Sequence, residues 1–127
     1  MRLYRRIFLV AMIFTVTAAV GGATRAADIS GTWFFFVDVG GTQGTPTFMF
    51  KQQGEALTGT VSNARGQQKI GGTVNHDKAV FGFAVTRDGQ PFKATYSGRI
   101  ESATTMTGTV EFSGALSGSG TWTATRK

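Results

Sequence analysis

The side chains that could carry chemistry are few in this chain of 127 residues, which has one histidine and no cysteine. The lack of cysteine excludes disulfides, thiol catalysis and thiolate metal sites. His76 lies in the stretch Asn75-His76-Asp77-Lys78, which is typical of a turn. Because no second histidine is present to complete a metal site, we interpret His76 as an exposed turn residue rather than a metal ligand or proton shuttle.

The carboxylates form no catalytic pattern either. Glu111 lies between Val110 and Phe112 inside a predicted strand, and alternation points its side chain outward. A register shifted by one residue would turn it inward, where desolvation raises the pKa of a catalytic acid. The hydroxyl groups have no base in reach, so we predict no catalytic residue, no metal and no cofactor. Five acids fall at or near predicted turns: Asp38, Glu55, Asp77, Asp88 and Glu101.

Residues 1–26 are predicted to be a secretory signal peptide. Met1–Arg6 is short and basic, Ile7–Val20 is apolar, and Ala23–Ala26 offers small residues for cleavage after Ala26. The apolar run is shorter than the roughly 20 residues that a spanning helix needs. Arg5-Arg6 leaves two export routes open, the general secretory pathway, which the short basic segment favours, and twin-arginine export. We expect a mature domain, residues 27–127, in the periplasm or outside the cell.

Export also changes the charge of the functional part. The whole chain carries +6, but four of its 13 lysines and arginines lie in the signal, which leaves nine bases and seven acids, or +2. So small a charge, spread over many turns, gives no electrostatic footprint for nucleic acid. We expect no stable membrane insertion after cleavage, and the sequence does not define an oligomeric state.

The mature segment has the pattern of an all-β domain. Thr, Val and Phe alternate with polar residues, Gly, Asn and Asp recur at regular intervals, and no window has a sustained helical period. Short turns, including Asp88-Gly89, connect the strands as in an up-and-down antiparallel meander. The predicted strands are Gly31–Val39, Thr45–Gln53, Ala56–Asn63, Gln67–Asn75, Lys78–Arg87, Gln90–Ile100, Thr104–Phe112 and Ser117–Thr125.

A weak internal repeat indicates that the eight strands close into a barrel. Each repeat places large, glycine and large residues on one face, and an inward glycine lets a strand coil sharply and lets the opposite wall approach. Gly31-Thr32-Trp33 on the first strand matches Gly120-Thr121-Trp122 on the last. Pairing of these strands would bring the tryptophans onto neighbouring strands, with Arg126 or Lys127 stacked over an indole. The repeat occurs at Leu57–Val61, Ile70–Val74, Tyr96–Ile100 and Met106–Val110.

These features resemble the calycin superfamily, which contains lipocalins, fatty-acid-binding proteins, avidins and related bacterial protease inhibitors. The resemblance rests on Gly31-Thr32-Trp33, on the rhythm of eight short strands and on the basic residue after the last strand. Gly54 and Leu57-Thr58-Gly59-Thr60 also follow the order of avidin-like proteins over about the first third of the domain. The resemblance implies a barrel, but a biotin site needs tryptophans between Trp33 and Trp122, and this chain has none; the lipocalin Thr-Asp-Tyr motif is absent too.

The whole mature chain is similar to small secreted bacterial modules with the pattern Asp-Ile-Ser-Gly-x-Trp … Gly-Thr-Trp-Thr-Ala-x-Arg-Lys. Here the two halves are Asp28–Trp33 and Gly120–Lys127. Such modules have no assigned activity, so the resemblance adds none to this chain.

Two functions without catalysis remain open from the sequence. In the first, the barrel mouth binds a small apolar ligand, because an eight-stranded barrel is just wide enough for side chains or one small ligand. Nine phenylalanines in the mature chain, however, favour a filled core. The predicted ligand contacts are inward aromatic residues: Trp33, Phe48, Phe50, Phe81, Phe83, Tyr96 and Trp122.

In the second function, the barrel is a filled protein-interaction module, such as an inhibitor or an accessory protein of the cell envelope. Phe34 and Phe36 alternate with Trp33 and Phe35 and therefore point outward. Two exposed phenylalanines on one strand would form a patch for a partner, unless the N-terminal segment folds over them.

Overall fold

The structure, a computed structural model, describes residues 27–127. The predicted signal peptide and its export route lie outside the described residues. Residues 27–127 contain no helix, and hence no helix long and apolar enough to cross a membrane. They form nine strands: β1 (Gly31–Val39), β2 (Thr42–Gly44), β3 (Thr47–Gln53), β4 (Ala56–Asn63), β5 (Gly66–Asn75), β6 (Lys78–Arg87), β7 (Gln90–Ile100), β8 (Thr105–Gly114) and β9 (Gly118–Arg126).

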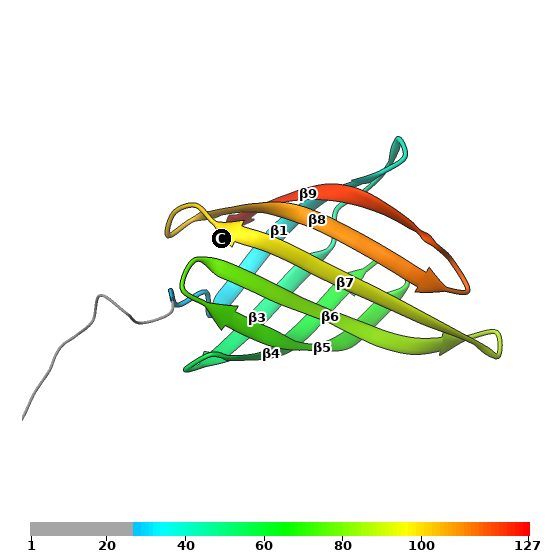
Figure 1. The fold of residues 1–127 in the computed structure, drawn as a ribbon, viewed down its shortest axis with the longest axis horizontal. Helices are drawn as coiled ribbons and strands as arrows, with labels where there is room; N and C mark the ends of the chain where they lie inside the picture. Colours follow the sequence, from blue (N-terminus) through cyan, green and yellow to red (C-terminus); the bar gives the residue numbers. More distant parts are fainter. Residues whose placement is uncertain (1–26) are drawn as a thin grey trace, which may run out of the picture.

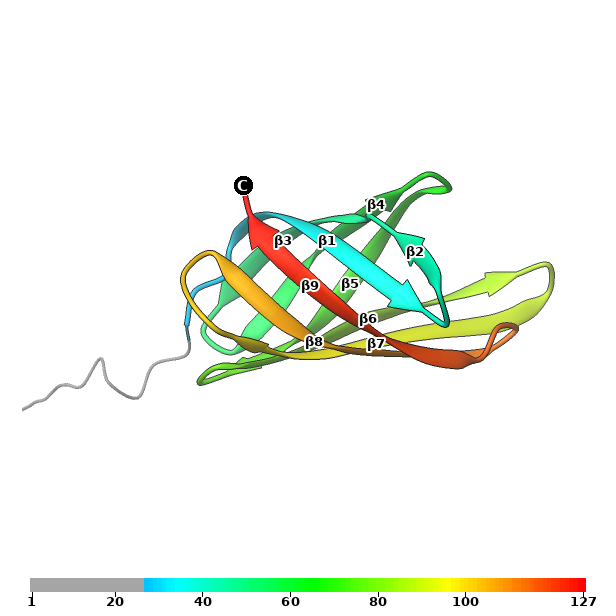
Figure 2. The same cartoon turned by 90° about the horizontal axis from the view of Figure 1, so that it is seen from above.

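Eight of these strands form one closed antiparallel barrel. β1 pairs with β3, each later strand pairs with the next, and β1 also pairs with β9, from Trp33 opposite Arg126 to Asp38 opposite Thr121. Figure 1 shows the tilted strands around a common axis, and Figure 2 shows β1 beside β9, where the ring closes. The predicted eight-stranded up-and-down barrel is confirmed, and it is consistent with a calycin-like fold.

The connection between β1 and β3 differs from the prediction of one strand over residues 45–53. β2 folds back onto the end of β1 through Gly40 and Gly41, whose positive φ angles of 59° and 89° suit a tight turn. Pro46 interrupts the strand because it has no N–H to donate to the ladder. Its carbonyl oxygen instead accepts a hydrogen bond from the Phe35 N–H at 3.0 Å.

The alternation that the sequence predicts is confirmed in the core. The large residues of the repeat and the predicted ligand residues are all buried or pack against the buried cluster. Phe83, Val85, Ile100 and Phe112 pack against that cluster and are only partly buried. The core also contains Ile29, from the segment before β1, and the inward alanines Ala79, Ala94 and Ala124.

Inward glycines set how closely the strands approach. A Cβ atom on Gly98 would overlap the indole of Trp122, which reaches across the backbone of Gly108 from β9. A Cβ atom on Gly72 would overlap the carbonyl oxygen of Val80 and lie 2.6 Å from the Cα of Phe81. The glycine repeat therefore has the predicted effect, because it removes side chains where the coiled wall has no room for them.

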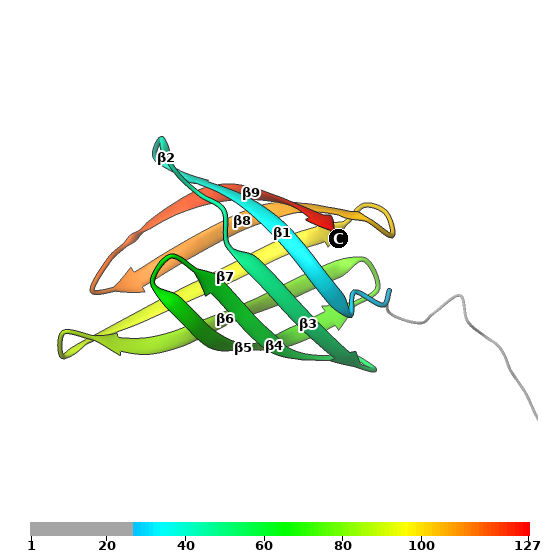
Figure 3. The ribbon, with the colours of Figure 1, turned by 180° about the vertical axis from the view of Figure 1, so that it is seen from behind.

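One pair of neighbouring strands is joined over only half its length. β5 and β6 pair from Asn75 opposite Lys78, beside their turn, to Gly71 opposite Gly82. Beyond that point residues 66–70 pair only with β4, and residues 83–87 pair only with β7. Figure 3 shows the β4–β5 and β6–β7 hairpins diverging from this point. We call this opening the β5–β6 split, and the end of the barrel where it lies the flared end.

Two neighbouring glycines of β5 provide a test of the close wall contact. We expect Gly72→Ala to lower the free energy of unfolding by about 1–3 kcal/mol, because the new methyl group has to displace the backbone of β6. Gly71→Ala is the matched control, since its Cβ would meet nothing nearer than the Leu57 carbonyl oxygen at 4.0 Å. Urea denaturation of both variants measures the difference. Equal stability of the two variants would show that β5 and β6 are not in the described register.

Candidate functional site

The middle of the barrel is occupied by aromatic rings. Phe35 lies at the centre, with its ring centroid 4.2 Å from that of Phe48 and 4.8 Å from the stacked indole of Trp122. Tyr96 stacks on Phe81 with centroids 5.3 Å apart. These separations are those of rings in direct contact. Five of the seven predicted ligand residues therefore lie in this ring cluster: Phe48, Phe50, Phe81, Tyr96 and Trp122. Trp33 is buried as well, under Arg126.

Both tryptophans are held by backbone hydrogen bonds. The Trp33 indole N–H donates to the carbonyl oxygen of Ile29 at 2.9 Å, and the Trp122 indole N–H donates to the carbonyl oxygen of Thr109 at 2.8 Å. A buried indole N–H needs such an acceptor. Each indole is thus fixed by its own barrel wall, and neither N–H is turned toward an open space in the barrel.

The N-terminal segment and Arg126 close the barrel end opposite the flared end. The guanidinium of Arg126 lies over the Trp33 ring, with its Cζ 4.9 Å from the centroid, as the sequence predicts. It donates to the carbonyl oxygens of Ser30 and Asp28, both at 2.7 Å, and of Ala103 at 2.9 Å. A planar guanidinium can hold several acceptors at once, so Arg126 ties three segments together. We call this the sealed end.

Asp28 lies at the sealed end too, where its carbonyl oxygen accepts a hydrogen bond from Arg126. The Ser30 backbone N–H, which donates to the Asp28 carboxylate at 2.9 Å, is the main cause that lowers the pKa of that carboxyl group below 3.8. The Ser30 hydroxyl lowers the pKa further, burial opposes this effect, and the charge of Arg126 makes the last contribution to the lowering. Ile29, between Asp28 and Ser30, is fully buried and plugs the barrel beneath Trp33.

Phe83, the seventh predicted ligand residue, lies apart from the ring cluster. Its ring centroid is 6.2 Å from that of Phe92, which stacks on Phe112 at 5.7 Å. Phe83, Phe112 and Val85 are partly buried, and they lie at the flared end. The structure therefore separates one predicted ligand residue from the other six.

The outer face carries the second predicted site. Phe34 and Phe36 are 48% and 45% exposed, and the side chain of Met49 on β3 is 53% exposed. Met49 lies opposite Thr32 and Phe34 opposite Thr47, so Met49 and Phe34 are diagonal neighbours across the β1–β3 ladder. The N-terminal segment, from Ala27 onward, does not fold over the two phenylalanines. We call Phe34, Phe36 and Met49 the Phe34 patch.

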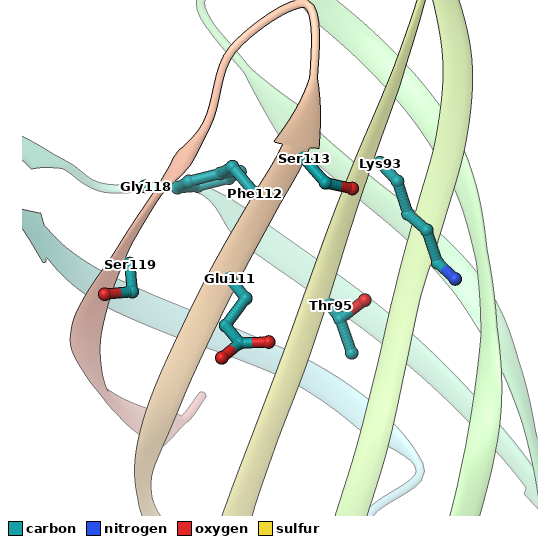
Figure 4. A pocket seen from close by; sticks show the side chains of 7 residues that line it. All are labelled: Lys93, Thr95, Glu111, Phe112, Ser113, Gly118 and Ser119. Atoms are coloured by element: carbon teal, nitrogen blue, oxygen red, sulfur yellow. The ribbon is translucent and has the colours of Figure 1, made fainter.

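A polar hollow of about 430 Å³ lies on the outside of β7, β8 and β9. Figure 4 shows Lys93, Thr95 and Glu111 beside it. Glu111 lies opposite Thr95 on one side and Ser119 on the other, and it is exposed, so the predicted outward register is confirmed. The hollow is thus lined by one carboxylate, one ammonium group and hydroxyls, and Glu111 and Lys93 are both exposed.

The lone histidine and the remaining acidic residues do not come together in the part of the chain that the structure describes. His76 is exposed in the β5–β6 turn, as predicted, with a positive φ of 55°. Within residues 27–127 no three His, Asp or Glu side chains gather closely enough to hold a metal ion.

Comparison with family models, curated proteins and solved structures found no match to this chain.

Two residues of these sites escaped the sequence analysis. Phe35 was assigned only to the core, although it is the centre that the predicted ligand residues contact. Met49 was missed as an exposed residue. It alternates with the inward Phe48 and Phe50, so the same rule that identified Phe34 and Phe36 would have found it.

The phenol of Tyr96 reports on whether the ring cluster is dry. Burial raises its pKa from 10.0 to about 12. The fold favours the neutral phenol, so this stabilisation is complete below pH 10 and is lost as the pH rises through about 12. We expect the tyrosinate absorbance that Tyr96→Phe removes to appear near pH 12. Titration at the ordinary pKa of a tyrosine would instead mean that water reaches the middle of the barrel.

Proposed function

We propose that this chain is an exported, non-catalytic binding module that engages a partner protein through its outer surface. One observation carries the proposal: rings fill the middle of the barrel, while three large apolar side chains stand together on its outside. Exposed apolar side chains that cluster on a small soluble domain are typical of an interaction site. Export rests on the sequence of the first 26 residues.

The composition of the Phe34 patch supports a protein partner. Aromatic residues and methionine are enriched in the centres of protein interfaces, and charged residues are depleted there. Phe34 lies opposite Thr125 and Phe36 opposite Thr123 on β9, and Met49 lies opposite Thr60 on β4. The patch is therefore bordered on both sides by uncharged hydroxyl side chains.

The shape of the patch adds to this argument. Phe34 and Phe36 are two residues apart on β1, so their Cα atoms are about 6.7 Å apart. They are held on paired strands rather than on a loop. A partner would meet a surface whose order is already established, which lowers the entropic cost of binding.

Replacing the two phenylalanines tests the proposal. We expect Phe34→Ser with Phe36→Ser to lower recovery of partner proteins from a cell-envelope extract by at least about ten-fold, because central aromatic residues carry most of the binding energy of an interface. Mass spectrometry of material bound to the immobilised protein measures the recovery. Val80→Ser is the matched control, since Val80 is 45% exposed on the outer face of β6, away from the patch. Unchanged recovery with the double variant, or an equal loss with the control, would contradict the role of the patch.

A small apolar ligand at the barrel mouth is the second candidate function. Phe83, Val85 and Phe112 are only partly buried at the flared end, so apolar surface remains there although the middle is filled. The ligand would cover these side chains without entering the ring cluster. The resemblance to calycins also favours this candidate.

A fluorescent fatty acid tests the second candidate. We expect its fluorescence to rise on binding and its affinity to fall about five-fold or more with Phe83→Ala, because the lost ring would have covered the probe. Phe34→Ser is the control and should leave the affinity unchanged. A featureless titration with lipid, retinoid and flavonoid probes alike would remove this candidate.

A further inference from the structure

We propose that the β5–β6 split accepts an extended acidic segment of a partner protein, which pairs with the edge of β6 as an added strand. The inference rests on the strand pairing, the side chains next to the split and the charges around it. It does not depend on the Phe34 patch.

The split leaves a length of strand backbone without a neighbour on one side. Within residues 27–127, Phe83–Arg87 pairs with β7 and has no strand partner on the other side, and Gly66–Ile70 pairs only with β4. Five residues of strand are about 17 Å long. Backbone N–H and C=O groups along such an edge can pair with an incoming strand. β2 has an outer edge too, but it is only three residues long.

The side chains beside the split define which residues the added strand would carry. Phe83 and Val85 point inward from β6 and are only partly buried. Ala84 and Thr86 point outward and are exposed. An added strand would continue the barrel wall, so its alternate side chains would pack over Phe83 and Val85 on the inside. This arrangement calls for apolar residues at every second position.

The charges around the split indicate which residues the added strand would carry at its outward-facing positions. Lys69 is exposed on the outer face of β5, and Lys93 is exposed on β7 opposite Ala84. Arg65 lies in the β4–β5 turn, while Asp88 is the one acid of that turn and the β6–β7 turn. The ion pair found among the described side chains joins Arg99 to Asp77 at the sealed end. Acidic side chains on the outward positions of the added strand would therefore meet unpaired cations.

The same charges argue against a second copy of this chain as the occupant. Edge-to-edge pairing of two copies would bring Lys69 and Lys93 of one split against those of the other, and like charges on adjacent strands destabilise the pair. An acidic strand reverses the sign of that interaction. The positive charges beside the split therefore disfavour a second copy of this chain and favour an acidic segment.

A synthetic peptide tests the proposal on the intact protein. The probe is a short blocked peptide in which valine and glutamate alternate. We expect NMR amide signals of residues 83–87, and of the facing residues 66–70, to shift and their hydrogen exchange to slow, because an added strand protects edge amides. A peptide with lysine in place of glutamate should not bind. An acidic peptide with proline in place of valine should not bind either, because proline cannot donate to a ladder.

Charge reversal on the protein completes the experiment. Lys69→Glu should weaken binding of the acidic peptide about five-fold, since an exposed charge pair contributes up to about 1 kcal/mol. Lys51→Glu, an exposed lysine on the outer face of β3, is the matched control and should leave binding unchanged. Phe34→Ser with Phe36→Ser should also leave it unchanged, which separates this site from the Phe34 patch. No shift with the acidic peptide, shifts confined to other strands, or equal binding of the proline peptide would overturn the proposal.

Discussion

The contact of aromatic rings around Phe35 is the interaction on which the rest of the structure depends. Phe35 lies on β1, between β3 and β9, and its ring touches rings from β3 and β9. Those contacts require the barrel to be narrow, and it is narrow because inward glycines remove side chains where strands cross closely. The indole of Trp122 fits only because Gly98 has no Cβ. The packing of aromatic rings in the middle of the barrel therefore depends on the inward glycines of its wall.

The two ends of the barrel differ because the contacts of Arg126 tie the chain together at the sealed end only, among the described residues. At the sealed end Arg126 bonds three carbonyl oxygens, stacks over Trp33 and holds Ile29 beneath it. A domain without disulfides has to stabilise its chain ends through such contacts. No comparable group spans the flared end of the described barrel, and there β5 separates from β6 while Phe83 and Phe112 keep partial exposure. Parts of a fold with fewer buried contacts open at a lower free-energy cost, so binding surfaces are found there.

The sequence predicts most of the barrel because its signals are local. Alternation from Trp33 to Val37 and the glycine repeat depend on residues two apart, and Asp88-Gly89 marks its own turn. The inward set could be predicted for the same reason. The difference between Phe81, which is buried, and Phe83, which is not, has no local signal, since both lie on the same face of β6. It arises because Phe81 packs against rings from β1, β3, β7 and β9, whereas Phe83 lies beyond the point where β5 separates from β6. The point at which two strands separate depends on the whole sheet.

The candidate sites also divide into those with a local sequence signal and those that depend on the whole sheet. Phe34 and Phe36 could be predicted to be exposed from alternation alone. The β5–β6 split could not, because residues 66–70 and 83–87 have ordinary strand patterns and each is well paired on its other side. An inward aromatic residue does not reveal whether it lines a cavity or fills it, which explains why the sequence left both readings open for Trp33 and Tyr96. Ring distances show that Tyr96 packs against other rings, and they require the three-dimensional arrangement of β1, β3, β6, β7 and β9.

The proposed recognition lies on the wall of the barrel because aromatic rings fill its middle. A hollow barrel can sacrifice core packing for a ligand, but here the ring cluster supplies the stability that a domain of about 100 residues obtains from its core alone. The apolar side chains that do not contribute to this packing, Phe34, Phe36 and Met49, favour association with other molecules and bring a risk of aggregation. The flared end limits the same risk differently, because Lys69 and Lys93 repel strands of like charge. Surfaces that are costly in this way are expected to persist where a partner covers them, which is why both proposed protein-binding sites lie on the wall rather than in the interior.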